Sequence, residues 1–255
     1  MDAYSVYRDI QKRTKGQFLI GVVGPVRTGK STLIRRFLEV LALPYLSEKE
    51  QAEVRDALPL SGEGKTITTV EPKFVPKEAV EIKVAGEISV KIRLIDCVGY
   101  MVDGAVGHLE GETERMVRTP WFSGEIPFTK AAELGTHKVI HDHSTIGIVV
   151  TCDGSFGEIP VENYEKPEER TVEELKHLGK PFVILLNTTR PYSEQVRNRA
   201  EDMYHKYQIP VIPVNCEQLK KEDVNMILEQ VLLEFPLVEV EYRMPRWVEM
   251  LPLSH

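Results

Sequence analysis

One short stretch of the sequence fixes both a local structure and a ligand class: GPVRTGKS at residues 24–31. An apolar run at 17–23 precedes it with the pattern of a buried strand, and helical spacing of apolar residues follows it from Lys30 to about Leu41. A strand, then GxxxxGK(S/T), then a helix is the P-loop arrangement. Its backbone N–H groups surround phosphates, and the helix amino terminus adds positive potential. The sequence therefore predicts a nucleoside triphosphate site with Mg²⁺.

Each polar side chain of this loop has a role that its chemistry suggests. We expect Lys30 to reach the β- and γ-phosphates and the Ser31 hydroxyl to bind Mg²⁺. The other nucleotide contacts predicted in the loop are Gly24, Arg27, Thr28, Gly29 and Thr32.

A second motif predicts the opposite side of the magnesium site. The apolar run at 91–95 ends in Asp96, which is followed by Cys97, Val98 and Gly99. Asp-x-x-Gly at the end of a strand is typical of a Walker B aspartate followed by a glycine that senses the γ-phosphate. We expect Asp96 to bind Mg²⁺ through water and the Gly99 N–H to meet the γ-phosphate.

Between these motifs lies a threonine-rich stretch, SGEGKTITT at 61–69. GTPase-like P-loop proteins place here a threonine that completes the magnesium shell. Thr66, Thr68 and Thr69 are candidates, and we favour the last two, with Thr69 as a metal ligand, because they adjoin the next predicted strand. Lys65 has two interpretations: it stabilises transition-state charge, or it is an ordinary solvated lysine. We prefer the second. Together with Lys30 and Asp96, the two favoured threonines form the predicted catalytic set.

The position that reads the base departs from the GTPase pattern. GTPases carry Asn-Lys-x-Asp after a late strand, and here Asn187 is followed by Thr188, Thr189 and Arg190. Arginine has only hydrogen-bond donors, so it cannot accept from the guanine ring as the aspartate does. ATP is therefore the expected nucleotide, with Asn187 and Arg190 at its site. The role of Arg190 stays open between contact with a phosphate and contact with another subunit. Tyr100 replaces the glutamine that orients water in Ras-like enzymes, so we expect slow hydrolysis.

The chain alternates strands with helices, which predicts an α/β fold with a mainly parallel sheet and helices on both faces. A hairpin at 73–84 and 88–95 is expected to add one antiparallel edge strand. We divide the chain into an amino-terminal helix at 1–15, a P-loop domain at 16–235, and an extension at 236–255 that begins a further segment. The other predicted helices are 47–57, 128–141, 167–178, 193–206 and 217–234, and the other strands 145–151, 181–186 and 209–214.

Composition and charge argue against several classes of protein. The net charge of -7 argues against nonspecific binding of nucleic acid. Three dispersed cysteines fit a reducing cytosol, and no apolar run is long enough to span a membrane.

His137 and His141 have the i, i+4 spacing that metal sites use, with His143 nearby. No supporting carboxylate pattern follows them in the sequence, so we do not predict a zinc site there.

Longer stretches resemble the amino-terminal ATPase region of the stage IV sporulation protein A family of endospore-forming bacteria. Similarity extends over essentially the whole chain. The matching stretches are GVVGPVRTGKST at 21–32, GKTITTVEPKFVP at 64–76, IRLIDCVGY at 92–100, TPWF at 119–122, PFTKAAELGTHKVIHDHSTIG at 127–147 and NTTRPY at 187–192.

This resemblance implies a P-loop domain related to the translation-factor GTPases that binds and hydrolyses ATP. In the family, hydrolysis drives self-association into a static polymer, the basement layer of the spore coat, in the mother-cell cytoplasm at the forespore surface. A small amphipathic membrane-bound peptide recruits the polymer, and coat proteins assemble on it. The family's P-loop lysine, Walker B aspartate and sensor threonines fall on Lys30, Asp96 and the Thr68/Thr69 segment. Its carboxy-terminal targeting and assembly regions are expected to be missing here.

Two other functions remain open on the sequence. One is a GTPase switch that regulates translation or ribosome assembly. The other is a structural subunit that binds a nucleotide without significant turnover.

Overall fold

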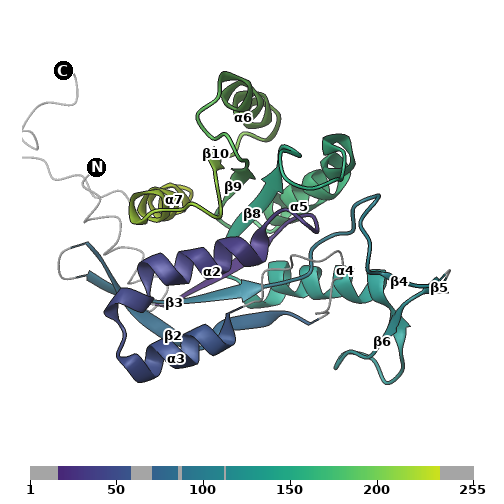
Figure 1. Cartoon of the computed structure of the whole chain (residues 1–255), viewed down its shortest axis with the longest axis horizontal. Helices are drawn as coiled ribbons and strands as arrows, with labels where there is room; N and C mark the ends of the chain where they lie inside the picture. The colour runs from purple at the N-terminus through teal and green to yellow at the C-terminus, as the bar shows by residue number, and fades with distance from the viewer. Residues whose placement is uncertain (1–16, 59–70, 86–87, 112, 236–255) are drawn as a thin grey trace, which may run out of the picture.

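The computed structural model describes residues 17–58, 71–85, 88–111 and 113–235 (Figure 1). The predicted amino-terminal helix and the carboxy-terminal extension lie outside the described residues, as do Lys65, Thr66, Thr68 and Thr69. Between Gln17 and Leu233 the chain forms one α/β unit around a central sheet.

The central sheet has six strands in the order β10-β9-β8-β1-β3-β2. All neighbours run parallel except β2, which pairs antiparallel with β3, so the predicted antiparallel edge strand is confirmed. The strands are β1 (Gln17–Val23), β2 (Lys73–Ala85), β3 (Ile88–Asp96), β8 (Ile146–Cys152), β9 (Phe182–Asn187) and β10 (Val211–Val214).

Helices cover both faces of this sheet, also as predicted. The core on one face joins the sheet to α2, α3 and α7, and the core on the other joins it to η2, α5 and α6. The helical elements are α2 (Lys30–Leu41), η1 (Leu43–Tyr45), α3 (Glu48–Ala57), α4 (Phe128–Lys138), η2 (Val139–His143), η3 (Val161–Tyr164), α5 (Glu165–His177), α6 (Glu194–Tyr207) and α7 (Lys221–Leu233).

Strand β8 shows why the sequence folds into three layers. All seven of its residues are buried, as a strand between two helical layers requires. Ile148 and Val150 belong to the core on one face and Val149 to the core on the other, because side chains alternate along a strand. The continuous apolar run at 146–150 therefore contributes to both cores.

The start of the last helix, predicted near residue 217, differs most from the structure. The helix expected from residue 217 begins at Lys221. Asn215 accounts for the delay, because its side-chain oxygen accepts from the N–H of Glu217 at 3.0 Å and its backbone carbonyl accepts from that of Gln218 at 3.0 Å. This turn occupies the residues that would form the first helical turn.

The long irregular stretch between β3 and α4 includes a projecting arm, residues 106–111 and 113–127, at the right-hand edge of Figure 1. The arm contains two small antiparallel pairs, β4 with β5 and β6 with β7. Four large apolar side chains of the arm are exposed: Val106, Leu109, Met116 and Phe122. Its short strands are β4 (Leu109–Glu110), β5 (Thr113–Glu114), β6 (Met116–Val117) and β7 (Ile126–Pro127).

The order of the strands identifies the ligand-binding edge of the sheet. From the central strand β1 the chain builds β2 and β3 on one side and β8, β9 and β10 on the other. Open α/β sheets bind ligands at the carboxyl ends of the strands where this order reverses. The loop that follows β1, at 24–29, lies at this point.

No helix among the described residues is both long enough and apolar enough to cross a bilayer.

Candidate nucleotide-binding site

The loop between β1 and α2 has the backbone shape of a phosphate-binding loop. Gly24, Arg27 and Gly29 have positive φ angles of 130°, 66° and 93°. A Cβ on Gly24 would lie 2.4 Å from the Val150 carbonyl oxygen, and one on Gly29 would lie 2.3 Å from Asn187 Nδ2. Glycine is therefore required at both positions for space as well as conformation. Arg27 holds a conformation that is rare outside glycine and that is found most often at functional sites.

Lys30, the first residue of α2, points its side chain back over the loop. Its Nζ donates to the carbonyl oxygens of Pro25 and Gly24, the latter at 3.4 Å. The side chain is buried, and burial lowers the pKa of Lys30. The ammonium group is thus held by neutral carbonyl groups in a place where an anion would stabilise its charge far better.

Ser31 and Asp96, the two predicted magnesium residues that the structure describes, lie together. Ser31 Oγ donates to Asp96 Oδ2 at 2.8 Å. The contact follows from the sheet, because β1 and β3 are neighbours and Val22 is in register with Asp96. Asp96 Oδ1 is buried and has no hydrogen-bond partner, and burial raises the pKa of Asp96.

These residues fit a magnesium ion. A hydroxyl and a carboxylate are hard oxygen donors of the kind that Mg²⁺ prefers, and Mg²⁺ characteristically keeps several waters beside one or two protein ligands. The free Oδ1 of Asp96 is an acceptor that such a water could satisfy. A bound ion would also offset the cost of burying this carboxylate.

The segment after Asp96 is bonded directly to the loop. Val26 N donates to the Tyr100 carbonyl at 2.9 Å, and Tyr100 N donates to the Gly24 carbonyl at 3.3 Å. Gly99 has φ 100°, and a Cβ there would lie 2.2 Å from Gly24 O and 2.6 Å from Lys30 Nζ. The glycine of Asp-x-x-Gly is therefore needed because two backbone segments meet at it.

The Gly99 N–H, which we predict to meet the γ-phosphate, is bonded to helix α4 in this structure. It donates to Thr136 Oγ1 at 3.1 Å, and that hydroxyl donates in turn to the Ala132 carbonyl at 2.8 Å. A nucleotide that takes this amide must displace Thr136. The sequence analysis missed Thr136, because a threonine inside a helical pattern carries no signal for a partner 37 residues away.

Asn187 links the loop to the segment that follows β10. Its Nδ2 donates to the Thr28 carbonyl at 3.0 Å, and its Oδ1 accepts from Cys216 N at 3.1 Å. Thr28 is buried, and its hydroxyl donates to the Pro25 carbonyl at 3.0 Å. Both ends of the Asn187 amide thus hold protein backbone. The predicted role of Asn187 at the nucleotide stays a prediction.

The two remaining predicted contacts lie at the margin of this site. Arg190 is exposed, and its backbone N–H donates to Thr188 Oγ1 at 3.1 Å. Thr32 is half-buried in the first turn of α2. Their contacts with a nucleotide stay predictions.

The strand order, the left-handed loop glycines, the buried Lys30 and the Ser31–Asp96 pair define an α/β P-loop nucleotide-binding protein. The family model described as "Stage IV sporulation protein A, ATPase domain" matches residues 1–236. The chain belongs to that family, as the sequence motifs predicted.

Relatives in two bacteria support this assignment. Stage IV sporulation protein A of Clostridioides difficile (strain 630) is 52% identical over 252 residues, which are 98% of this chain and 51% of that protein. The Bacillus subtilis (strain 168) protein of the same name is 46% identical over 256 residues, covering 100% of this chain and 52% of the relative. The chain therefore spans about half the length of the curated relatives it matches.

Among solved structures, a mutated variant of a protein named SsGBP aligns with 91% of this chain and 61% of its own. The TM-score is 0.47 and the sequence identity is 16%. The assignment of the fold rests on the strand order and the loop of this chain itself.

Replacing Asp96 by asparagine should stabilise the ligand-free protein and abolish most of its response to Mg²⁺. The pKa of Asp96 is higher in the folded than in the unfolded protein, so the wild type loses stability as pH rises through the folded-state pKa. Asp96→Asn has no titrating group at this position and should not show that loss. Thermal unfolding across pH, with and without Mg²⁺ and ATP, measures both effects. Asp103→Asn, at an exposed carboxylate, is the control and should match wild type. A full Mg²⁺ response in Asp96→Asn would contradict the assignment.

Replacing Thr136 by valine should destabilise the nucleotide-free protein by about 1–3 kcal/mol, because the buried Gly99 N–H loses its acceptor. Thr171→Val is a matched control. Thr171 is also fully buried, and its hydroxyl donates to the Pro167 carbonyl of its own helix at 2.7 Å. Urea unfolding compares the two variants, and equal losses would show that the Gly99 bond contributes nothing.

Proposed function

We propose that this chain binds ATP with Mg²⁺ and hydrolyses it slowly, and that in the whole protein this turnover drives self-assembly of the spore coat basement layer. The observation that carries the proposal is the contact between Ser31 and Asp96 beside the buried Lys30. It supplies the oxygen ligands and the cation that a magnesium–triphosphate complex needs at the switch point of the sheet. The fold is proposed to be of the translation-factor-related type.

The choice of ATP over GTP rests on what surrounds the late strand β9. Recognition of guanine needs a side chain that accepts hydrogen bonds from the ring N–H and from the amino group. The side chain of Arg190 has no acceptor, and both ends of the Asn187 amide are bonded to backbone groups. The carboxylate that reads guanine in GTPases is therefore replaced at this position, which supports ATP over GTP in the proposal.

Slow hydrolysis is supported by the position of Tyr100. Its hydroxyl donates to Glu174 Oε1 at 2.6 Å, and the guanidinium of Arg170 lies 4.0 Å from its ring centroid. A phenol engaged in this way does not orient water as the glutamine of Ras-like enzymes does. In this proposal Thr68 and Thr69, with Thr69 on the metal, assist Lys30 and Asp96 in the reaction.

Helix α4 offers a route from the nucleotide to the surface. At one end Thr136 holds the Gly99 amide, and at the other the helix is tied to the arm. Phe128 N donates to the Arg115 carbonyl at 2.9 Å, and Thr129 N donates to Glu114 Oε1 at 2.8 Å. A γ-phosphate that takes the Gly99 amide would release Thr136 and permit α4 to move with the arm. The exposed apolar side chains of the arm are then the proposed contacts for self-association.

The location and the partners are proposed for the whole protein, because this chain spans about half the length of its relatives. There we propose the mother-cell cytoplasm at the forespore surface, with recruitment by a small amphipathic membrane-anchoring peptide and assembly of coat proteins on the polymer. No nucleic acid takes part in this proposal.

Side-by-side calorimetry with ATP and GTP, followed by phosphate release, tests the proposed activity. We expect tighter Mg²⁺-dependent binding of ATP, and a loss of roughly 10²-fold or more in turnover for Lys30→Ala, because the cation that stabilises the transferring phosphoryl group is removed. A clear preference for GTP would indicate a GTPase switch. ATP binding without phosphate release by the wild type would indicate a structural subunit.

The arm is tested by Met116→Asp in the full-length protein. A charge at this exposed position should reduce ATP-dependent sedimentable polymer while ATP affinity stays unchanged, because burying a carboxylate in a contact is costly. Met226→Asp is the matched control, since the two methionines are similarly exposed, at 49% and 40%, on different surfaces. Equal polymer yields from both variants would exclude the arm from the contact.

A further inference from the structure

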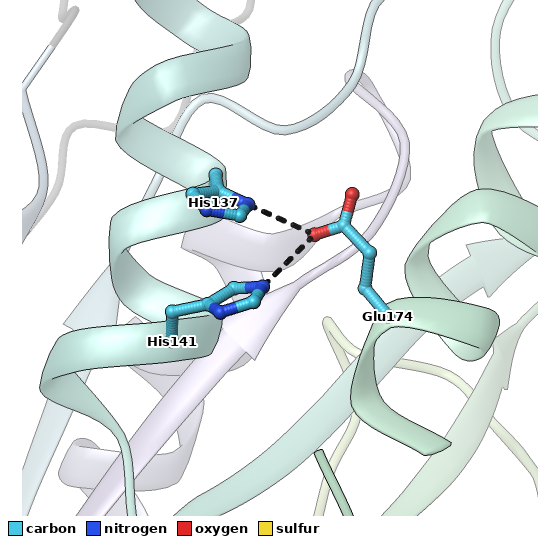
Figure 2. A group of neighbouring side chains, drawn as sticks. All are labelled: His137, His141 and Glu174. Atoms are coloured by element: carbon cyan, nitrogen blue, oxygen red, sulfur yellow. Dashed lines mark ion pairs between the residues drawn. The ribbon is translucent and has the colours of Figure 1, made fainter. Parts of the chain in front are cut away.

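Three metal-ligating side chains converge outside the nucleotide site (Figure 2). They are His137 at the end of α4, His141 in η2 and Glu174 in α5. Glu174 Oε2 lies 3.5 Å from His137 Nδ1 and 4.0 Å from His141 Nε2. The three ligand atoms all lie within 4.8 Å of one another. The sequence showed the two histidines without a carboxylate, and the fold brings that carboxylate from another helix.

A π-helical turn sets the position of His141. In η2 the Ser144 N–H donates to the Val139 carbonyl at 3.1 Å, across five residues. Lys180 fixes the end of this turn, because its Nζ donates to the carbonyls of His141 at 3.0 Å and Ser144 at 2.7 Å. The rings of His137 and His141 are stacked, with centroids 3.8 Å apart and planes tilted by 31°.

The two oxygens of Glu174 have different surroundings. Oε1 accepts from the Tyr100 hydroxyl at 2.6 Å and forms an ion pair with Arg170 Nε at 3.5 Å. Oε2 is buried and has no hydrogen-bond partner, although it faces both imidazoles. One oxygen is therefore oriented by neighbouring groups while the other is left for a ligand, which is how outer-shell residues prepare a metal-binding carboxylate.

The histidines are also suited to be neutral ligands. Two imidazolium ions with ring centroids 3.8 Å apart would repel each other, so at least one ring is favoured in its neutral form. Burial and the neighbouring His137 lower the pKa of His141. The side chains of His137 and His141 remain 49% and 30% exposed, so an ion can reach them from solvent.

We propose that His137, His141 and Glu174 bind a divalent transition-metal ion of the zinc class, with water in the fourth position. Two imidazoles and a carboxylate are a known zinc donor set, and imidazole disfavours Mg²⁺. Tetrahedral bonds of about 2.0–2.1 Å put ligand atoms roughly 3.3 Å apart. The observed O–N distances of 3.5 and 4.0 Å are close to this value, and all three ligand atoms lie within 4.8 Å of one another, so side-chain movements would close the remaining gap.

The ion would join α4 to α5 directly behind the Asp-x-x-Gly segment. His137 follows Thr136, which holds the Gly99 amide, and Glu174 holds the Tyr100 hydroxyl. The site is distinct from the predicted magnesium site, which uses Ser31 and Asp96. Binding of zinc does not depend on the proposed ATPase activity and can be measured without a nucleotide.

The test is calorimetric titration of Zn²⁺ into the nucleotide-free, Mg²⁺-free chain without a histidine tag, with Co²⁺ absorption as a second readout. We expect one ion per chain and the visible spectrum of four-coordinate Co²⁺. His141→Asn and Glu174→Gln should each weaken binding at least about tenfold. Glu174→Gln keeps an acceptor for Tyr100, so its fold should be preserved.

His205→Asn is the matched control. His205 also forms an i, i+4 pair with a carboxylate, Glu201, at 3.9 Å, but no third ligand joins that pair among the described residues. Its affinity for Zn²⁺ should equal that of wild type. If His141→Asn fails to fold, the half-exposed His137→Asn provides the same comparison. Unchanged zinc affinity in the ligand variants, or no zinc uptake by the folded wild type, would overturn the proposal.

Discussion

The contact between the P-loop and the end of β3 determines how the rest of the site is placed. Two backbone hydrogen bonds join Val26 and Gly24 to Tyr100, and Ser31 reaches Asp96 because β1 and β3 are in register. Gly99 has no room for a side chain at this junction. A carboxylate and a hydroxyl from distant parts of the chain therefore meet before any ligand arrives, so binding need not bring these two groups together.

This preorganisation has an electrostatic cost in the empty protein. Lys30 and Asp96 are both buried. Burial lowers the pKa of Lys30 and raises the pKa of Asp96, so in each case it favours the neutral form of the side chain. The nearest partners of Lys30 are carbonyl groups, and one oxygen of Asp96 has no partner. Groups in such surroundings gain more from an added phosphate or cation than the same groups in water, because the local dielectric is low.

Local patterns were enough to predict most of the fold. The apolar spacing of α2, the continuous apolar run of β8 and the hairpin of β2 with β3 each follow from neighbouring residues. The start of α7 was misplaced because Asn215 forms a turn that competes with the helix. In the site, Lys30, Ser31 and Asp96 could be found from motifs. Thr136 and Glu174 could not, because each acts on a segment that only the tertiary fold brings near.

The bond between Gly99 and Thr136 also bears on how the protein would distinguish ATP from its hydrolysis product. In this structure the Gly99 N–H donates to an internal hydroxyl, and in the proposed function a terminal phosphate would compete for the same donor. ADP lacks that phosphate, so under the proposed function it would leave the internal bond intact. The ADP-bound and empty chains would then share one conformation, and departure of inorganic phosphate, rather than of ADP, would be the event that resets helix α4.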